Sequence, residues 1–213
     1  MQKEVWTEVK AEDFLQKYLP VAKHILCKKP EDVVKECKKF SFPLVLKLSA
    51  KNLVHKSDIG AVTVVKHPDE LQMKLDILMA AAKKYKLILE GILVQEYIEG
   101  HQLIIGIKRD PTFGHCVMLG SGGIFVEMIK DVAFRVCPIT DDDAQEMINE
   151  LKGKRILEGY RGGIKANLGE LRKILVKVSL LPKKVPKIDE LDINPFILNS
   201  KTGKVVDARI VVG

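Results

Sequence analysis

Apolar residues recur along the chain with two spacings, one typical of buried strands and the other of helices. Residues 44–48 form a short run that is apolar except for Lys47, as in a buried strand, and residues 92–97 form a second strand-like run. After Pro68 the apolar residues instead recur every three or four positions, as on one face of a helix: Leu71, Leu75, Leu78 and Ala82. The first half of the chain is therefore predicted to be a sheet backed by helices, one of which opens at Pro30.

Turn and capping residues organise the second half of the chain. Residues 103–107 and 115–119 are strand-like runs that flank a turn containing proline and glycine, which predicts a hairpin. Thr140 and Asn167 are each followed three residues later by an acidic residue, the pattern of a helix N-terminus. The proline-bounded stretch 182–186 is predicted to be a linker.

Composition indicates a globular protein of the cytoplasm. Of the 213 residues 46% are hydrophobic and 30% charged, and no apolar run approaches the roughly 18 residues of a membrane helix, so no membrane role is predicted. The N-terminus lacks the apolar core of a signal peptide. The four cysteines include no C-x-x-C pair, which speaks against zinc and against a disulfide scaffold.

The net charge of +7 permits binding of nucleic acid, nucleotides or acyl phosphates, and charge alone does not choose among them. The lysines are scattered without an aromatic platform on which bases would stack, and only 6% of the residues are aromatic. We therefore predict that the chain does not bind nucleic acid.

Two neighbouring features of the first half point to phosphate chemistry. An unpaired ammonium inside a buried strand costs several kcal/mol (roughly), so Lys47 either reaches outward or meets an anion such as phosphate. In the polar segment that follows, His55 stands beside Lys56, and a neutral imidazole nitrogen can attack a phosphoryl group at pH 7. By itself the pattern equally fits a surface turn with a solvated histidine.

The C-terminal strands, residues 192–198 and 204–211, allow a geometric prediction. A turn centred between residues 200 and 201 places Asn194 opposite Asp207, with Cβ atoms about 5 Å apart. An amide and a carboxylate oxygen suit Mg²⁺ bound mainly through a nucleotide. The same register pairs Asp192 with Arg209, so Asp192 fits a cross-strand ion pair and metal binding equally well. A slip of one residue would separate Asn194 from Asp207.

A glycine-rich stretch, residues 120–123, could bring backbone N–H groups to phosphate oxygens or could simply reverse the chain. The residues that follow predict a strand region with one strongly charged face, which is either solvated or catalytic: Glu127, Lys130, Asp131 and Arg135.

Several motifs, taken in order, resemble those of the ATP-grasp β subunit of ADP-forming (NDP-forming) acyl-CoA synthetases, and more loosely those of succinyl-CoA synthetase β subunits. The resemblance covers nearly the whole chain. It rests on Lys47 and on residues 55–60, 94–98, 106–111, 122–135, 192–195 and 206–209. It implies an α+β protein with the ATP-grasp fold, whose two α+β lobes hold the nucleotide between them. Residues 1–97 would form N-terminal helices and the first lobe, and residues 98–213 the second lobe with a magnesium-binding hairpin.

The resemblance also implies roles for individual residues. Lys47 would hold the nucleotide phosphates, and His55 would carry phosphate on a swinging loop. The backbone of an interlobe hinge would read adenine: Glu96, Tyr97 and Ile98. The other implied residues are Ser57, Asp58, Gly60 and Gln102 for the nucleotide, Arg135 for catalysis, and Asn194 and Asp207 for Mg²⁺. The chain departs from the family at Gln102, where glutamate is usual, and at Ala61, where a second glycine is usual.

Members of this family reversibly convert an acyl-CoA, phosphate and ADP to the acid, CoA and ATP through an acyl phosphate and a phosphohistidine. The resemblance therefore implies Mg²⁺ as cofactor, ATP or ADP as substrate, and an α subunit that carries the CoA-binding domain and the main phosphohistidine in an α2β2 assembly. Two alternatives remain: a free-standing ATP-grasp carboxylate ligase, and a nucleotide-sensing subunit without turnover. The His55 segment speaks against the first, and Gln102 is the one hint of the second.

Overall fold

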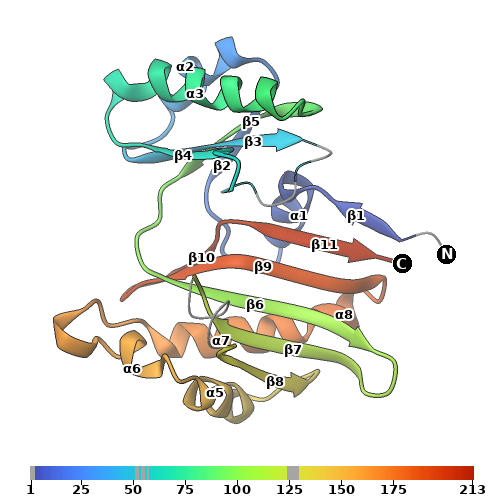
Figure 1. The fold of residues 1–213 in the computed structure, drawn as a ribbon. Coiled ribbons are helices and arrows are strands. Elements are labelled where there is room, and N and C mark those ends of the chain that lie inside the picture. The colour runs from blue at the N-terminus through green and yellow to red at the C-terminus, as the bar shows by residue number, and fades with distance from the viewer. Residues whose placement is uncertain (1–2, 51–52, 54–55, 57, 124–129) are drawn as a thin grey trace. The chain divides into compact units, whose positions relative to one another are not determined.

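The computed structural model describes residues 3–50, 53, 56, 58–123 and 130–213. These residues form two compact units, one of residues 22–97 and one of residues 1–21 with 98–213. Each unit contains an antiparallel sheet and a hydrophobic core of its own (Figure 1).

The unit of residues 22–97 is a four-stranded sheet with helices on one face (Figure 1). Its strand order is β2-β5-β3-β4, all neighbours being antiparallel. The strands are β2 (His24–Cys27), β3 (Leu44–Ala50), β4 (Val62–Val65) and β5 (Leu89–Glu96), and the helices are α2 (Pro30–Cys37), the 3₁₀ turn η1 (Pro68–Glu70) and α3 (Leu71–Lys84). The predicted apolar face of α3 is confirmed, because the four predicted residues are buried in the core of this unit: Leu71, Leu75, Leu78 and Ala82.

Strand β3 shows how the sequence divides the two faces of this sheet. Leu44, Leu46 and Leu48 belong to the core that α2 and α3 cover. Because successive side chains of a strand point to opposite faces, Val45, Lys47 and Ser49 belong to the other face. The alternation places Lys47 on the helix-free face of the sheet.

The other unit contains a seven-stranded sheet with the order β1-β11-β9-β6-β7-β8, in which β10 also pairs with β9. Its strands are β1 (Glu4–Trp6), β6 (His101–Asp110), β7 (Gly114–Ser121), β8 (Val132–Val136), β9 (Ile188–Leu198), β10 (Gly203–Val205) and β11 (Ala208–Val212). Its helices are α1 (Glu8–Leu15), α5 (Asp141–Glu150), α6 (Lys154–Leu157), η2 (Tyr160–Gly162), α7 (Leu168–Ser179) and α8 (Leu181–Lys184). Side chains from α1, α5, α7 and α8 share one core with the sheet.

The predicted helix starts are confirmed at both sites. The Thr140 and Asp143 side chains each accept a hydrogen bond from the other's backbone N–H, at 3.1 and 2.8 Å, which completes a capping box at α5. The Asn167 side chain accepts from the N–H of Glu170 at 3.0 Å. The predicted linker 182–186 is wrong in part, because α8 includes Pro182. Proline is tolerated there because the first-turn N–H that it lacks has no partner within the helix.

The structure also corrects the predicted lobe of residues 1–97 at its N-terminal end. Strand β1 pairs with β11, and Ala11 and Leu15 of α1 are buried in the core of the larger unit. The first 21 residues therefore belong with residues 98–213, because they complete the edge of that sheet and its core.

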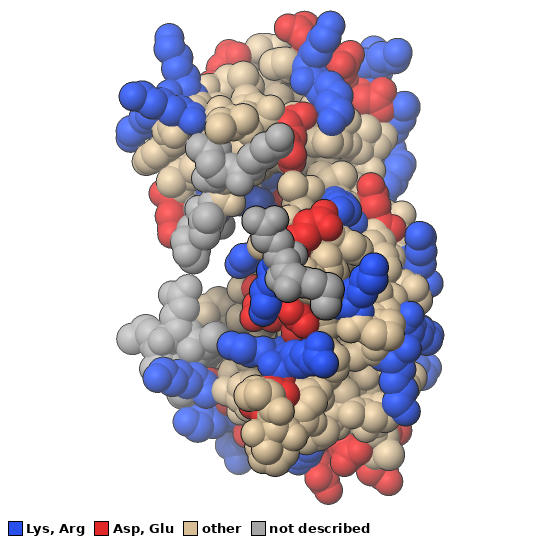
Figure 2. All heavy atoms as spheres, turned by 90° about the vertical axis from the view of Figure 1, so that its right-hand side faces the viewer, with Lys and Arg blue, Asp and Glu red and all other residues tan. Residues whose placement is uncertain are grey.

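No helix among the described residues is long and apolar enough to cross a membrane. On the face shown in Figure 2, lysines and arginines are interspersed with aspartates and glutamates, so the net charge of +7 does not gather there in a patch of one sign.

Candidate functional site

Lys47 is one of three buried polar side chains on the helix-free face of the four-stranded sheet. Lys47 is 6% exposed, Ser49 5% and Gln95 1%. Val45 pairs with Gln95 and Lys47 with Leu93, so Gln95 shares the face of Lys47. Neither Ser49 nor Gln95 was predicted from the sequence as a site residue. The signal that could have found them is the register between the two strands, which brings both onto the face of the buried lysine.

The segment of residues 96–98, predicted to read a base, begins with a glutamate that is hydrogen-bonded to Lys23, the residue before β2. The backbone N–H of Lys23 donates to Oε1 of Glu96 at 2.6 Å, and the N–H of Glu96 donates to the carbonyl of Lys23 at 2.9 Å. Tyr97 is 42% exposed and Ile98 is half-buried. The N–H of Glu96 therefore already donates within the protein, which limits the expected backbone contacts with a base.

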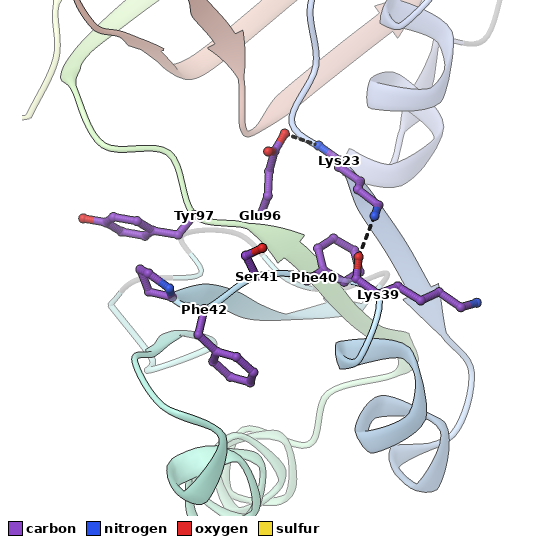
Figure 3. A pocket seen from close by; sticks show the side chains of 8 residues that line it. Lys23, Lys39, Phe40, Ser41, Phe42, Glu96 and Tyr97 are labelled. Carbon is purple, nitrogen blue, oxygen red and sulfur yellow. Dashed lines mark hydrogen bonds between the residues drawn. The ribbon is translucent and has the colours of Figure 1, made fainter.

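A pocket of about 280 Å³ lies beside this segment, at the end of the sheet where β5 ends and β2 and β3 begin (Figure 3). Its walls are formed by Lys23, Lys39, Phe40, Ser41, Phe42, Pro43, Glu96 and Tyr97. The Lys23 ammonium lies 4.7 Å from the centroid of the Phe40 ring and donates to the carbonyl of Lys39 at 2.6 Å. The pocket thus offers aromatic walls with a few polar groups. The pocket residues before Glu96 were not predicted from the sequence, because nothing in their spacing distinguishes them.

The predicted register of the C-terminal strands is confirmed. Asp192 pairs with Arg209, and the N–H of Asn194 donates to the carbonyl of Asp207 at 3.1 Å. Asn194 is exposed and Asp207 is half-buried. The ladder of paired residues ends at Ala208 and Ile193, and this hydrogen bond brings together the next residue on each side, one with an amide oxygen and the other with a carboxylate. Such hard oxygen donors fit Mg²⁺, whose remaining ligands are commonly water and phosphate oxygens.

Gln102 lies on the same face of the larger sheet as Asn194. Its neighbours Leu103 and Ile105 are buried in the core, so the exposed Gln102 points to the opposite face. On β9, Ile193 is likewise in the core and Asn194 is exposed. The face of this sheet that is turned away from the core therefore carries the predicted ribose-contacting and metal-binding residues.

Arg135, predicted to be catalytic, lies on the other face. It pairs across the sheet with Val117, which is in the core, and its guanidinium binds Glu146 at 3.2 Å and Glu150 at 2.5 Å on α5. These hydrogen bonds, that of Glu150 foremost, raise the pKa of Arg135 above its ordinary value. The structure does not bring Arg135 together with Gln102, and we leave it out of the candidate site.

Two predicted residues of the histidine segment, His55 and Ser57, lie outside the described residues, as does Glu127. Asp58 is exposed. Gly60 has a left-handed backbone, with φ of 70°, which favours glycine. Ala61 is fully buried in the core of the smaller unit, so this departure from the family fills the core with a methyl group.

Comparison with known proteins identifies the fold and the family. The model of the ATP-grasp domain family matches residues 1–212. The chain therefore belongs to the ATP-grasp family, and the predicted α+β fold of that type is confirmed.

The relatives of the chain show to which group of ATP-grasp proteins it belongs. The chain is 39% identical over 210 residues to the acetate–CoA ligase [ADP-forming] I subunit beta of Pyrococcus furiosus, covering 96% of this chain and 90% of that protein. The predicted membership of the ADP-forming acyl-CoA synthetase β subunits, a group of acid–CoA ligases, is thereby confirmed.

Solved structures of the dinucleotide-forming acetyl-coenzyme A synthetase 1 of Ca. Korarchaeum cryptofilum have the same fold. The complex with coenzyme A, Ca-AMPCP and HgCl⁺ is 38% identical, with a TM-score of 0.93 over 99% of this chain and 94% of that one. The complex with coenzyme A and Mg-AMPPCP, whose phosphohistidine segment points towards the nucleotide binding site, is 36% identical, with a TM-score of 0.85 over 98% and 93%.

Proposed function

We propose that this chain binds ATP or ADP with Mg²⁺ and transfers the phosphoryl group for an ADP-forming acyl-CoA synthetase. The reversible overall reaction is acyl-CoA, ADP and phosphate to acid, CoA and ATP, through a phosphohistidine. The observation that carries the proposal is the buried Lys47 on a helix-free sheet face, flanked by the buried polar residues Ser49 and Gln95. A buried ammonium in such a setting suits an anionic ligand, because an anion offsets the cost of removing the charge from water.

The roles follow from the places of the residues in each unit. Lys47 holds the phosphates, as a fixed positive charge near the transferring group. Tyr97 and Ile98 follow the end of β5 beside the pocket and serve the base, while Gln102, exposed on the larger sheet, accepts a hydrogen bond from the ribose. In the segment around His55, the residues proposed to bind the nucleotide are Ser57, Asp58 and Gly60.

Asn194 and Asp207 are the residues that would hold Mg²⁺. The ion, when bound, neutralises phosphate charge and so favours phosphoryl transfer. The chain's own contribution is to supply two oxygen ligands from residues whose backbones are joined by a hydrogen bond.

The His55 imidazole is proposed to receive the phosphoryl group. One ring nitrogen attacks the γ-phosphorus of ATP, a nitrogen–phosphorus bond forms, the bond to the β-phosphate oxygen breaks, and ADP leaves. The phosphoryl group then passes on through the partner. The reverse sequence makes ATP.

The chain works with an α subunit in this proposal. The relative from Pyrococcus furiosus is named as a beta subunit, which implies a partner in that protein. We propose that the partner of this chain carries the CoA-binding domain and the main phosphohistidine, in an α2β2 assembly. We place the complex in the cytoplasm, where the free thiols of Cys27, Cys37, Cys116 and Cys137 remain reduced.

Nucleotide binding is tested by thermal unfolding of the isolated chain. Adding Mg²⁺ and ADP is expected to raise the melting temperature, because a ligand selective for the folded state stabilises it. Asp207→Ala is expected to keep the fold and to lose most of the magnesium-dependent part of the shift. Asp142→Ala, at an exposed carboxylate of α5, is the control and keeps the full response. An unchanged magnesium response in Asp207→Ala would remove the metal assignment.

The dependence on a partner gives a second test. The isolated chain, supplied with acid, CoA, ATP and Mg²⁺, is expected to form no acyl-CoA, and addition of the α subunit is expected to restore synthesis. Product formed by the chain alone would instead favour a free-standing ligase. A complete assembly that binds nucleotide without turnover would favour a nucleotide-sensing subunit.

A further inference from the structure

Asp131 carries a buried carboxylate that joins three distant parts of the larger unit. It is 3% exposed. The Ser121 hydroxyl at the end of β7 donates to Oδ2 at 2.5 Å. After α5, the N–H of Lys152 donates to Oδ1 at 2.7 Å and that of Gly153 to Oδ2 at 2.9 Å. Both carboxylate oxygens therefore accept hydrogen bonds.

The hydrogen bonds favour the ionised form of this carboxyl. Burial alone would raise the pKa of Asp131, but the bonds from Ser121, Gly153 and Lys152 together outweigh burial and lower the pKa below its ordinary value. Asp131 is thus a buried, ionised group whose position is fixed by the donors around it.

The packing around Asp131 leaves no spare room. A Cβ added at Gly153 would lie 2.7 Å from the Ser121 hydroxyl oxygen and 3.2 Å from Oδ2 of Asp131. A backbone bond reinforces the junction, since the N–H of Ser121 donates to the carbonyl of Asp131 at 3.1 Å. Ser121 is held from two directions, by the side chain and by the backbone of the same aspartate.

Gly122, the residue after Ser121, contacts the backbone of Gln102. The N–H of Gly122 donates to the carbonyl of Gln102 at 2.8 Å. A Cβ at Gly122 would lie 2.6 Å from the carbonyl carbon and oxygen of Gln102, so the two backbones touch and only glycine fits. A shift of Ser121 would therefore also displace Gly122, against which the backbone of Gln102 packs.

We propose that Asp131 is a positioning residue of the nucleotide site, acting through Ser121 and Gly122 on Gln102. It does not touch the nucleotide. It holds the start of the glycine-rich stretch against the backbone of Gln102, so that the Gln102 side chain is oriented before the ribose arrives. This inference rests on the proposed function and adds a residue that the sequence analysis treated only as part of a charged face.

The test compares nucleotide affinities by calorimetry, with Mg²⁺ and ADP, at a temperature at which every variant is folded. Asp131→Asn places an amide N–H₂ against the donors and is expected to weaken binding about tenfold, the loss typical of a hydrogen bond to a charged group. Ser121→Ala removes one donor, leaves the carboxylate, and is expected to weaken binding about threefold, a smaller share of the same loss. If Asp131→Asn does not fold, the nucleotide affinity of Ser121→Ala tests the inference in its place.

Asp110→Asn is the matched control. This carboxylate also accepts two backbone N–H bonds, from Thr112 at 2.8 Å and Phe113 at 2.9 Å, but it lies at the opposite end of β6 from Gln102. Asp110→Asn is expected to leave the affinity for ADP with Mg²⁺ unchanged. A role in stability alone would not separate these variants, because all are compared in the folded state.

A pair of substitutions tests whether the position of Ser121 affects nucleotide binding. Gly153→Ala is expected to weaken binding because its methyl group collides with the Ser121 hydroxyl. Ser121→Ala removes that oxygen, so the double variant is expected to bind better than Gly153→Ala alone.

Affinity equal to that of the unmodified chain in Asp131→Asn, or a double variant no better than Gly153→Ala, would overturn the inference while leaving the proposed function intact. No binding of nucleotide by the unmodified chain would overturn both.

Discussion

Replacing Lys47 with methionine is expected to weaken binding of Mg²⁺ and ADP to the chain by about ten- to a hundredfold. The lysine is 6% exposed on the helix-free face of its sheet. A hydrogen bond to a charged group contributes about 1.5–3 kcal/mol, and about 1.4 kcal/mol is a factor of ten in affinity. Methionine has nearly the length of lysine without the charge, so the affinity is measured by calorimetry on a side chain of similar size.

The same variant separates a binding role from a structural role. A phosphate role predicts that the nucleotide affinity of the folded variant falls, whereas a purely structural role predicts that only the free energy of unfolding without ligand changes. Lys66→Met, at the exposed residue after β4, is the control and should change neither quantity. A Lys47→Met chain that unfolds more easily and binds nucleotide normally would contradict the phosphate role.

Replacing His55 with alanine is expected to lower nucleotide-dependent turnover of the reconstituted enzyme about a hundredfold or more, because removing a covalent carrier blocks the transfer step. Nucleotide binding by the isolated chain should persist, since Lys47 and the Asn194/Asp207 pair remain. The measurement is the rate of ATP formation from acyl-CoA, ADP and phosphate, with the α subunit at saturation.

Phosphate labelling provides a second measurement on the same variant. Label from γ-labelled ATP should appear on the unmodified chain in acid-labile, base-stable form, as for phosphohistidine, and should be absent from His55→Ala. His67→Ala, at the exposed histidine that precedes η1, should label and turn over normally. Full turnover by His55→Ala would show that this histidine is an ordinary surface residue, whose loss typically changes stability by no more than about 0.5 kcal/mol.

The amino-acid sequence by itself determined the features that depend on neighbours along the chain. The buried face of α3 follows from apolar residues three and four apart, and the starts of α5 and α7 follow from Thr140 and Asn167, which each cap the N–H group three residues ahead. The pairing of Asn194 with Asp207 was also within reach, because a hairpin with a short turn leaves little freedom in register.

Only the tertiary structure decided which elements from distant parts of the chain meet. The 3-residue strand β1 is too short to show periodicity, and its pairing with β11 moved the first 21 residues into the larger unit. Arg135 and Gln102 are both charged or polar residues on strands, yet Arg135 lies on the face of the core residues Ala133 and Val117, where it pairs with Glu146 and Glu150 of α5. Burial of Gln95 and the convergence of Ser121, Lys152 and Gly153 on Asp131 depend likewise on packing between segments, which local spacing does not encode.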